Sequence, residues 1–133
     1  MYMIFVTLPV QDLSRSRAFY DGLGFTFEKY WSDERTATLS VDENIVVKLL
    51  TRDNFAQLLD GEAGDPASGP TVITCLGAQS RELVDDLVAK AEAAGGRAWF
   101  PANEEPTTHT GSFADPDGHV WQLTWLEPVH VID

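Results

Sequence analysis

A tight turn between two strands is encoded near the end of the chain by Phe113-Ala114-Asp115-Pro116-Asp117-Gly118-His119-Val120-Trp121-Gln122-Leu123. Its centre, residues 115–118, has the pattern of a type I turn, with proline at the second position and glycine at the fourth. The apolar residues on both sides indicate strands over 111–114 and 120–125. In the later strand, Trp121, Leu123 and Trp125 alternate with smaller side chains, which predicts that this face enters a core.

The residues before this hairpin complete a module of one helix and four strands. Ser80 is a suitable N-cap, leucine and valine recur at helical spacing over 81–94, and Gly95 follows where a helix commonly ends. An apolar strand over 72–76 precedes the helix. A short strand over 97–100 and a polar loop over 101–108 follow it. The predicted order is therefore β-α-β-β-β.

The first half of the chain repeats this order. A strand that includes 6–10 leads to Asp12, an N-cap for a helix over 13–21, and strands are predicted over 25–31, 36–41 and 45–51. Glycine and proline crowd into the segment between the halves, which is typical of a linker. We therefore predict one α+β domain of two tandem modules, with module one at 3–51, the linker at 52–70, module two at 71–126 and a tail at 127–133.

Each module leaves one sheet face without a helix, and two such faces can enclose a cleft. Strand alternation predicts which side chains face it, although a register shift of one residue would invert any assignment. In 72–76 the choice is ambiguous by one residue, and we favour Val72 and Thr74. The predicted cleft residues are Phe5, Thr7, Pro9, Val46, Lys48, Leu50, Val72, Thr74, Val120, Gln122 and Thr124. His109, on the approach to a strand, is expected at the cleft mouth or as a solvated loop residue.

Composition limits the compartment and the partners. The chain has 133 residues with 9 basic and 21 acidic side chains, a net charge of −12 that disfavours nucleic acid and anionic membranes as partners. No apolar run approaches the roughly 20 residues of a membrane span, and the N-terminus does not resemble a signal peptide. The single cysteine, Cys75, fits a reducing cytoplasm and a buried strand position.

Two stretches of the chain resemble the vicinal oxygen chelate superfamily, which includes glyoxalase, bleomycin-resistance proteins and extradiol dioxygenases. One is the turn of 113–123. The other is Leu8-Pro9-Val10-Gln11-Asp12-Leu13, followed by Ser16, Ala18-Phe19-Tyr20 and Leu23-Gly24-Phe25. The resemblance spans residues 4–126 and implies the glyoxalase/bleomycin resistance/dihydroxybiphenyl dioxygenase-like fold. Within the superfamily, the chain looks like bacterial proteins labelled predicted lactoylglutathione lyases.

The resemblance also implies a divalent metal, held by His, Gln or Glu on the first and last strands of both modules and acting as a Lewis acid. The corresponding positions here are Phe5, Lys48, Val72 (or Ile73) and Gln122. Phenylalanine and valine have no donor atom, and a lysine ammonium repels a metal ion. Gln122 alone is far short of the three or four ligands that such metals take. The sequence therefore predicts no metal and no other cofactor.

Lys48 is a candidate ligand-binding residue, because it is a charged residue in an otherwise apolar strand. It lies between Val47 and Leu49 in an apolar strand, where an ammonium buried without a partner costs free energy. Either its stem packs while the ammonium reaches solvent at the cleft mouth, or it binds an anionic group of a ligand with Gln122 as a second contact. His119 is expected at a strand edge with a backbone partner.

Three functions remain open. The first is metal-free binding of a small amphipathic or anionic molecule in the cleft, as in resistance proteins of this fold. The second is an enzyme of the glyoxalase (lactoylglutathione lyase) or dioxygenase class, whose catalytic residues the sequence does not identify. The third is a non-catalytic interaction subunit. The substituted metal positions favour the first function, and the free sheet edges of each module predict a homodimer.

Overall fold

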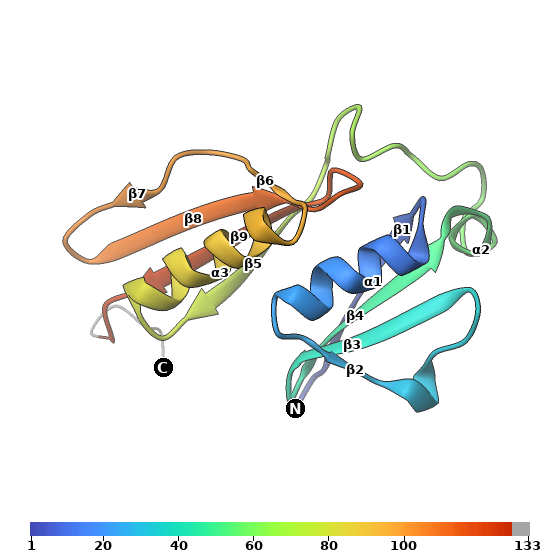
Figure 1. Ribbon diagram of the computed structural model, residues 1–133, viewed down its shortest axis with the longest axis horizontal. Coiled ribbons are helices and arrows are strands. Elements are labelled where there is room, and N and C mark those ends of the chain that lie inside the picture. Colours follow the sequence, from blue (N-terminus) through green and yellow to red (C-terminus); the bar gives the residue numbers. More distant parts are fainter. Residues whose placement is uncertain (129–133) are drawn as a thin grey trace. The chain divides into compact units, whose positions relative to one another are not determined.

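The computed structural model describes residues 1–128. The chain divides into two compact units, one of Met1–Asp65 and one that begins at Pro66, and each is built on its own sheet (Figure 1). The α+β class and the repeated order of one helix among four strands are confirmed. Residues 129–133, most of the predicted tail, lie outside the described residues. No helix within 1–128 is long and apolar enough to cross a bilayer.

The first unit contains a four-stranded sheet in the order β1-β4-β3-β2. The strands are β1 (Ile4–Val10), β2 (Thr26–Phe27), β3 (Thr36–Asp42) and β4 (Ile45–Thr51). β1 runs parallel to β4, and the other pairs are antiparallel. Helix α1 (Leu13–Gly22) and the 3-10 turn η1 (Lys29–Trp31) lie between these strands in the sequence, and helix α2 (Arg52–Ala56) follows β4. Asp12 caps α1 as predicted, because its carboxylate accepts a hydrogen bond from the backbone N–H of Arg15 at 3.1 Å.

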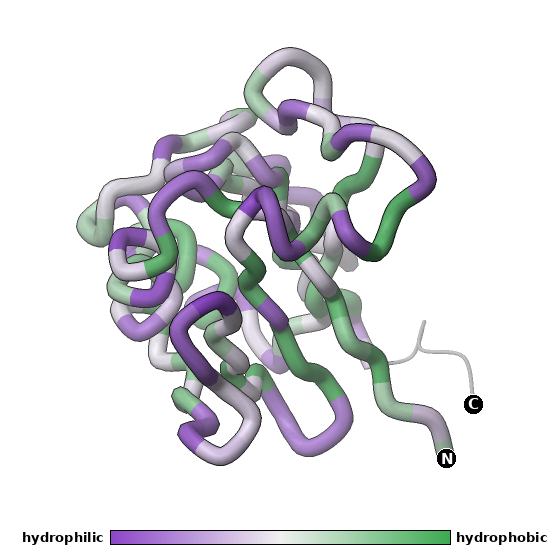
Figure 2. Tube along the Cα trace, turned by 90° about the vertical axis from the view of Figure 1, so that its right-hand side faces the viewer, coloured by the Kyte–Doolittle hydropathy of each residue, from purple (hydrophilic) through white to green (hydrophobic). Residues whose placement is uncertain are grey.

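Helix α1 packs on one face of this sheet. Phe19 and Tyr20 of the helix are fully buried, as are Leu39 of β3 and Val47 and Leu49 of β4, which share one face. Removing these side chains from water is the main stabilising contribution to the unit. Figure 2 shows the hydrophobic residues running along the strands, with hydrophilic residues at the turns that join them.

The second unit repeats this topology with the strand order β5-β9-β8-β6, and β7 pairs with β8 near its start, on the same edge as β6. The strands are β5 (Ile73–Ala78), β6 (Arg97–Ala98), β7 (Asn103–Glu104), β8 (Thr108–Ala114) and β9 (Val120–Leu126). As in the first unit, the first strand runs parallel to the last. Helix α3 (Arg81–Ala93) packs closely on β8, where a Cβ on Gly111 would lie 2.9 Å from a methyl group of Val88. The predicted internal repeat is therefore confirmed.

Apart from helix α2, which occupies the start of the predicted linker, the structure differs from the predicted elements mainly in two places. The strand expected over 25–31 is shortened to β2 and followed by η1, because hydroxyl groups bond to this backbone and compete with strand pairing. The loop expected over 101–108 contains β7, and β8 already begins at Thr108. The predicted turn at 115–118 is present, with the N–H of Gly118 donating to the carbonyl of Asp115 at 3.0 Å.

Candidate functional site

The face of the first sheet opposite α1 presents Lys48. The register places Lys48 of β4 between Thr7 of β1 and Thr38 of β3, in one row across three strands. Phe5 and Leu50 share this face, two residues along their strands from Thr7 and Lys48. The face assignment made from alternation therefore agrees with the register for Phe5, Thr7, Lys48 and Leu50, and their part in ligand binding remains a prediction.

A pocket of about 330 Å³ opens in the first unit and is lined by Phe5, Trp31, Thr38 and Lys48. This volume lies at the lower end of the range for ligand pockets, about 300 to 1,000 Å³. Phe5 and Trp31 are 52% and 60% exposed, whereas Thr38 is only 1% exposed. The pocket thus combines two aromatic rings open to solvent, a buried hydroxyl group and a single lysine.

The Lys48 side chain is half-buried and has no hydrogen-bond or ion-pair partner among residues 1–128. An anion that reaches the Lys48 ammonium forms a charge-assisted hydrogen bond, without competing with a counter-charge from the described part of the chain. The geometry of Lys48 therefore suits the recognition of an anionic group.

Trp31 reaches the pocket because η1 is hydrogen-bonded to β3. The hydroxyl of Thr38 donates to the carbonyl of Trp31 at 2.6 Å, and the N–H of Thr38 donates to the hydroxyl of Ser32 at 2.9 Å. The N–H of Glu28 donates to the carbonyl of Thr38 at 2.8 Å. The exposed indole thus projects from a backbone segment that is fixed to the sheet.

Sequence reasoning did not identify Trp31 or Thr38 as site residues. Trp31 was assigned to a strand, and no local pattern distinguishes a strand from a 3-10 turn at that point. Thr38 was open to prediction, because in β3 it alternates with Ala37 and Leu39, which lie on the opposite, helix-covered face.

In the second unit the open face was only partly predicted. Gln122 pairs with Cys75 of β5, and the hydroxyl of Thr124 lies 3.5 Å from the Cys75 thiol, so Gln122 and Thr124 share the face opposite α3, as predicted. The assignment of Thr74 and Val72 to that face is wrong by one residue. Thr74 pairs with Trp121 on the helix-covered face, and Val72 precedes β5 with the same parity. Cys75 is exposed rather than buried.

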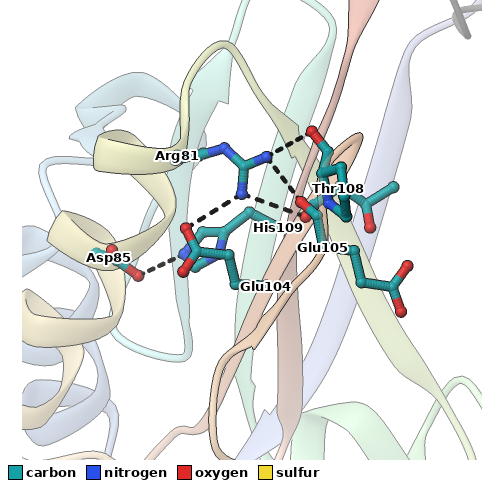
Figure 3. Close-up of polar contacts among 7 residues, drawn as sticks. Arg81, Asp85, Glu104, Glu105, Thr108 and His109 are labelled. Carbon is teal, nitrogen blue, oxygen red and sulfur yellow. Dashed lines mark hydrogen bonds and ion pairs between the residues drawn. The ribbon is translucent and has the colours of Figure 1, made fainter.

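The prediction that His109 lies at the cleft mouth or in a solvated loop is also wrong. Because β8 begins at Thr108, His109 lies within the strand, opposite Trp125 on the helix-covered face, and is 4% exposed. Its Nε2 lies 2.7 Å from Oδ1 of Asp85 on α3 (Figure 3). His119 has the predicted backbone partner, since its carbonyl accepts from the N–H of Asp115 at 2.9 Å.

Arg81 completes the polar cluster around His109 (Figure 3). Its guanidinium donates to the carbonyls of Glu105 and Pro106 at 2.7 and 2.8 Å and pairs with the Glu104 carboxylate at 3.2 Å. These contacts fix the loop between β7 and β8 to the start of α3. The role of this cluster is therefore structural: it holds β8 and the loop before it against helix α3.

Two successive units with the same strand order define a class of α+β proteins built from paired β-α-β-β-β modules. A family model described as the Glyoxalase/Bleomycin resistance protein/Dioxygenase superfamily matches residues 3–123. The chain belongs to this superfamily. Comparison with curated proteins found no match.

Several solved structures share the fold. A glyoxalase-related enzyme from Fulvimarina pelagi is 23% identical, with a TM-score of 0.81 over 100% of this chain and 93% of that chain. A hypothetical protein from S. aureus is 25% identical, with a TM-score of 0.78 over 94% of each chain. A lactoylglutathione lyase from Agrobacterium tumefaciens is 16% identical, with a TM-score of 0.69 over 92% of each chain.

The residues at the superfamily's metal positions do not fit a metal ion. The register identifies the third position as Ile73, because it lies two residues before the partner of Gln122, just as Phe5 lies two residues before the partner of Lys48. Phe5 and Ile73 have hydrocarbon side chains, and Lys48 is a cation. Within residues 1–128, no group of three or more His, Cys, Asp or Glu side chains is placed to hold a metal.

Proposed function

We propose that this protein binds a small amphipathic anion, without a metal ion, in the pocket formed by Phe5, Trp31, Thr38 and Lys48. The observation that supports this most directly is the Lys48 ammonium, which lies in a pocket with two exposed aromatic rings and has no partner among residues 1–128. The lysine recognises the acidic group, and the rings cover the apolar part of the ligand.

The expected energetics favour a weak to moderate small-molecule affinity. A hydrogen bond to a charged group contributes about 1.5–3 kcal/mol, and each methylene-sized group buried against the rings adds about 0.8 kcal/mol. Ordering the ligand opposes both contributions. A glyoxalase-type reaction is the less favoured function, because three of the four superfamily metal positions have no neutral or anionic donor.

Calorimetric titration with small organic acids and their neutral amides tests the proposal. Lys48→Met should lower the affinity for the acids about ten- to a hundredfold and leave the weak affinity for the amides unchanged. Lys90→Met removes an exposed cation of helix α3 in the second unit and serves as the matched control, with acid affinity expected to stay at the wild-type value.

Thermal melting of the two variants checks that both fold. Lys48→Met should be as stable as the wild type or more so, because methionine fills similar volume without the desolvation cost of an ammonium. Equal acid affinity in the wild type and in Lys48→Met would contradict the proposal, as would a full panel of acids that does not bind.

A further inference from the structure

We infer that the anion bound in this pocket is a planar aromatic acid, a single ring with a carboxylate, and that Thr38 positions Trp31 to select it. The inference rests on the proposed function, because it takes the pocket as the ligand site and Lys48 as the acid-binding residue. What it adds is the chemical class of the ligand and a residue that determines specificity.

The two aromatic rings of the pocket come from different elements and pair with no other ring of the described residues. Phe5 belongs to β1 and Trp31 to η1, and within residues 1–128 neither ring is in contact with another aromatic ring. Both nevertheless line one pocket while more than half exposed. Large aromatic surfaces that find no partner within the fold are available to a third ring, which makes favourable stacked or edge-on contacts.

The cation of the pocket comes from the strand at the middle of this part of the sheet. β4 lies between β1 and β3 in the sheet, so Lys48 projects from the strand between that of Phe5 and that to which η1 is bonded. An acid held by Lys48 therefore lies in a pocket that Phe5 of β1 and Trp31 of η1 also line. A pocket of about 330 Å³ suits one ring with a short acidic arm.

Trp31 is bonded directly to a buried hydroxyl, in addition to the bonds that Glu28 and Ser32 make with the Thr38 backbone. The 2.6 Å bond from Thr38 Oγ1 to the Trp31 carbonyl joins η1 to the sheet at the residue that bears the indole. With only 1% of its surface exposed, Thr38 acts through Trp31 and is a positioning residue. A wall held in place before binding costs less conformational entropy when the ligand arrives.

The test compares acids of equal size and charge that differ in ring planarity. Benzoate is titrated against cyclohexanecarboxylate, and phenylacetate against cyclohexylacetate, into the wild type, Trp31→Leu, Thr38→Val and Thr38→Ser. The wild type should prefer the aromatic member of each pair by about two- to tenfold. Trp31→Leu and Thr38→Val should reduce that preference to near one, and Thr38→Ser, which keeps the hydroxyl, should retain it.

The outcomes distinguish a failure of the ligand class from a failure of the proposed function. If wild type binds aromatic and cyclohexyl acids equally, the ligand class is wrong while the proposed function stands. If no acid binds, the proposed function and this inference both fail. A folded Thr38→Val that keeps the aromatic preference overturns the positioning role, and if this variant does not fold, Trp31→Leu still decides the ligand class.

Discussion

His109 Nε2 lies 2.7 Å from Asp85 Oδ1, and this contact joins β8 to α3 on the helix-covered face of the second sheet. The His109 side chain is 5% exposed and that of Asp85 is 64% exposed. A histidine that the sequence predicts at the cleft mouth or in a solvated loop is therefore a buried link between a strand and a helix.

Removing this contact should destabilise the second unit. In Asp85→Ala, the Nε2 of His109 loses its carboxylate partner, while Nδ1 already has none among residues 1–128. We expect the free energy of unfolding to fall by about 1–3 kcal/mol, measured by urea denaturation. The neighbouring Asp86 forms an exposed pair with Lys90 at 3.0 Å, so Asp86→Ala should cost only about 0.3–0.5 kcal/mol. Equal losses in the two variants would show that the His109 contact adds nothing.

The conformation of Gly118 makes a second stability prediction. Its φ is +101°, and a Cβ there would lie 2.9 Å from the backbone Cα of Ala67. Gly95 has a similar φ of +108°, but a Cβ there would meet no atom within 4 Å. Gly95→Ala should therefore cost about 1–2 kcal/mol of backbone strain, and Gly118→Ala distinctly more. Thermal unfolding of both variants measures the two losses of stability. Equal losses would show that the close approach of Ala67 to Gly118 has no steric effect.

The metal content of the purified protein follows from the donor set. Because Phe5, Lys48 and Ile73 stand at three of the four superfamily metal positions, we expect no stoichiometric Zn, Ni, Fe or Mn after dialysis. Elemental analysis provides the measurement. About one metal ion per chain would refute the proposal of metal-free binding.

The edge strands predict a dimer in solution. β1 and β5 each end their sheet's strand order, and Ile4 and Ile73 on these strands are 55% and 56% exposed. Apolar side chains on a free edge favour association with another chain. Light scattering should give twice the chain mass of 14.7 kDa, and Ile73→Lys should shift the equilibrium toward the monomer. A single-chain mass for the wild type across the micromolar range would refute this prediction.

The repeat and the fold were predictable because their signals are local. The Asp115–Gly118 turn, the N-caps Asp12 and Ser80, and strand alternation each depend on a few adjacent residues. These local signals occur in the same order in both halves of the chain, so they were sufficient to predict the order of helices and strands. The face of Lys48 was predictable for the same reason, since apolar residues flank it on both sides.

The rest of the site depends on contacts that adjacent residues do not encode. Thr74 was misplaced because the apolar run of 72–76 fits either face, and only pairing with Trp121 on β9 decides between them. His109 was misplaced because the start of β8 is fixed by Arg81, which binds the preceding loop from helix α3. Trp31 enters the pocket through a hydrogen bond to Thr38, seven residues further along the chain.

The chain's charge sets the rates at which an anion binds and leaves Lys48. An anionic ligand approaches a protein of net charge −12, so long-range repulsion slows its encounter with the pocket. Added salt screens that repulsion over a Debye length of about 8 Å at physiological ionic strength, and it also weakens the bound pair. Association and dissociation should therefore both become faster with salt, while the equilibrium constant changes little. The electrostatic contribution to binding is then visible in stopped-flow kinetics and nearly hidden in an equilibrium titration.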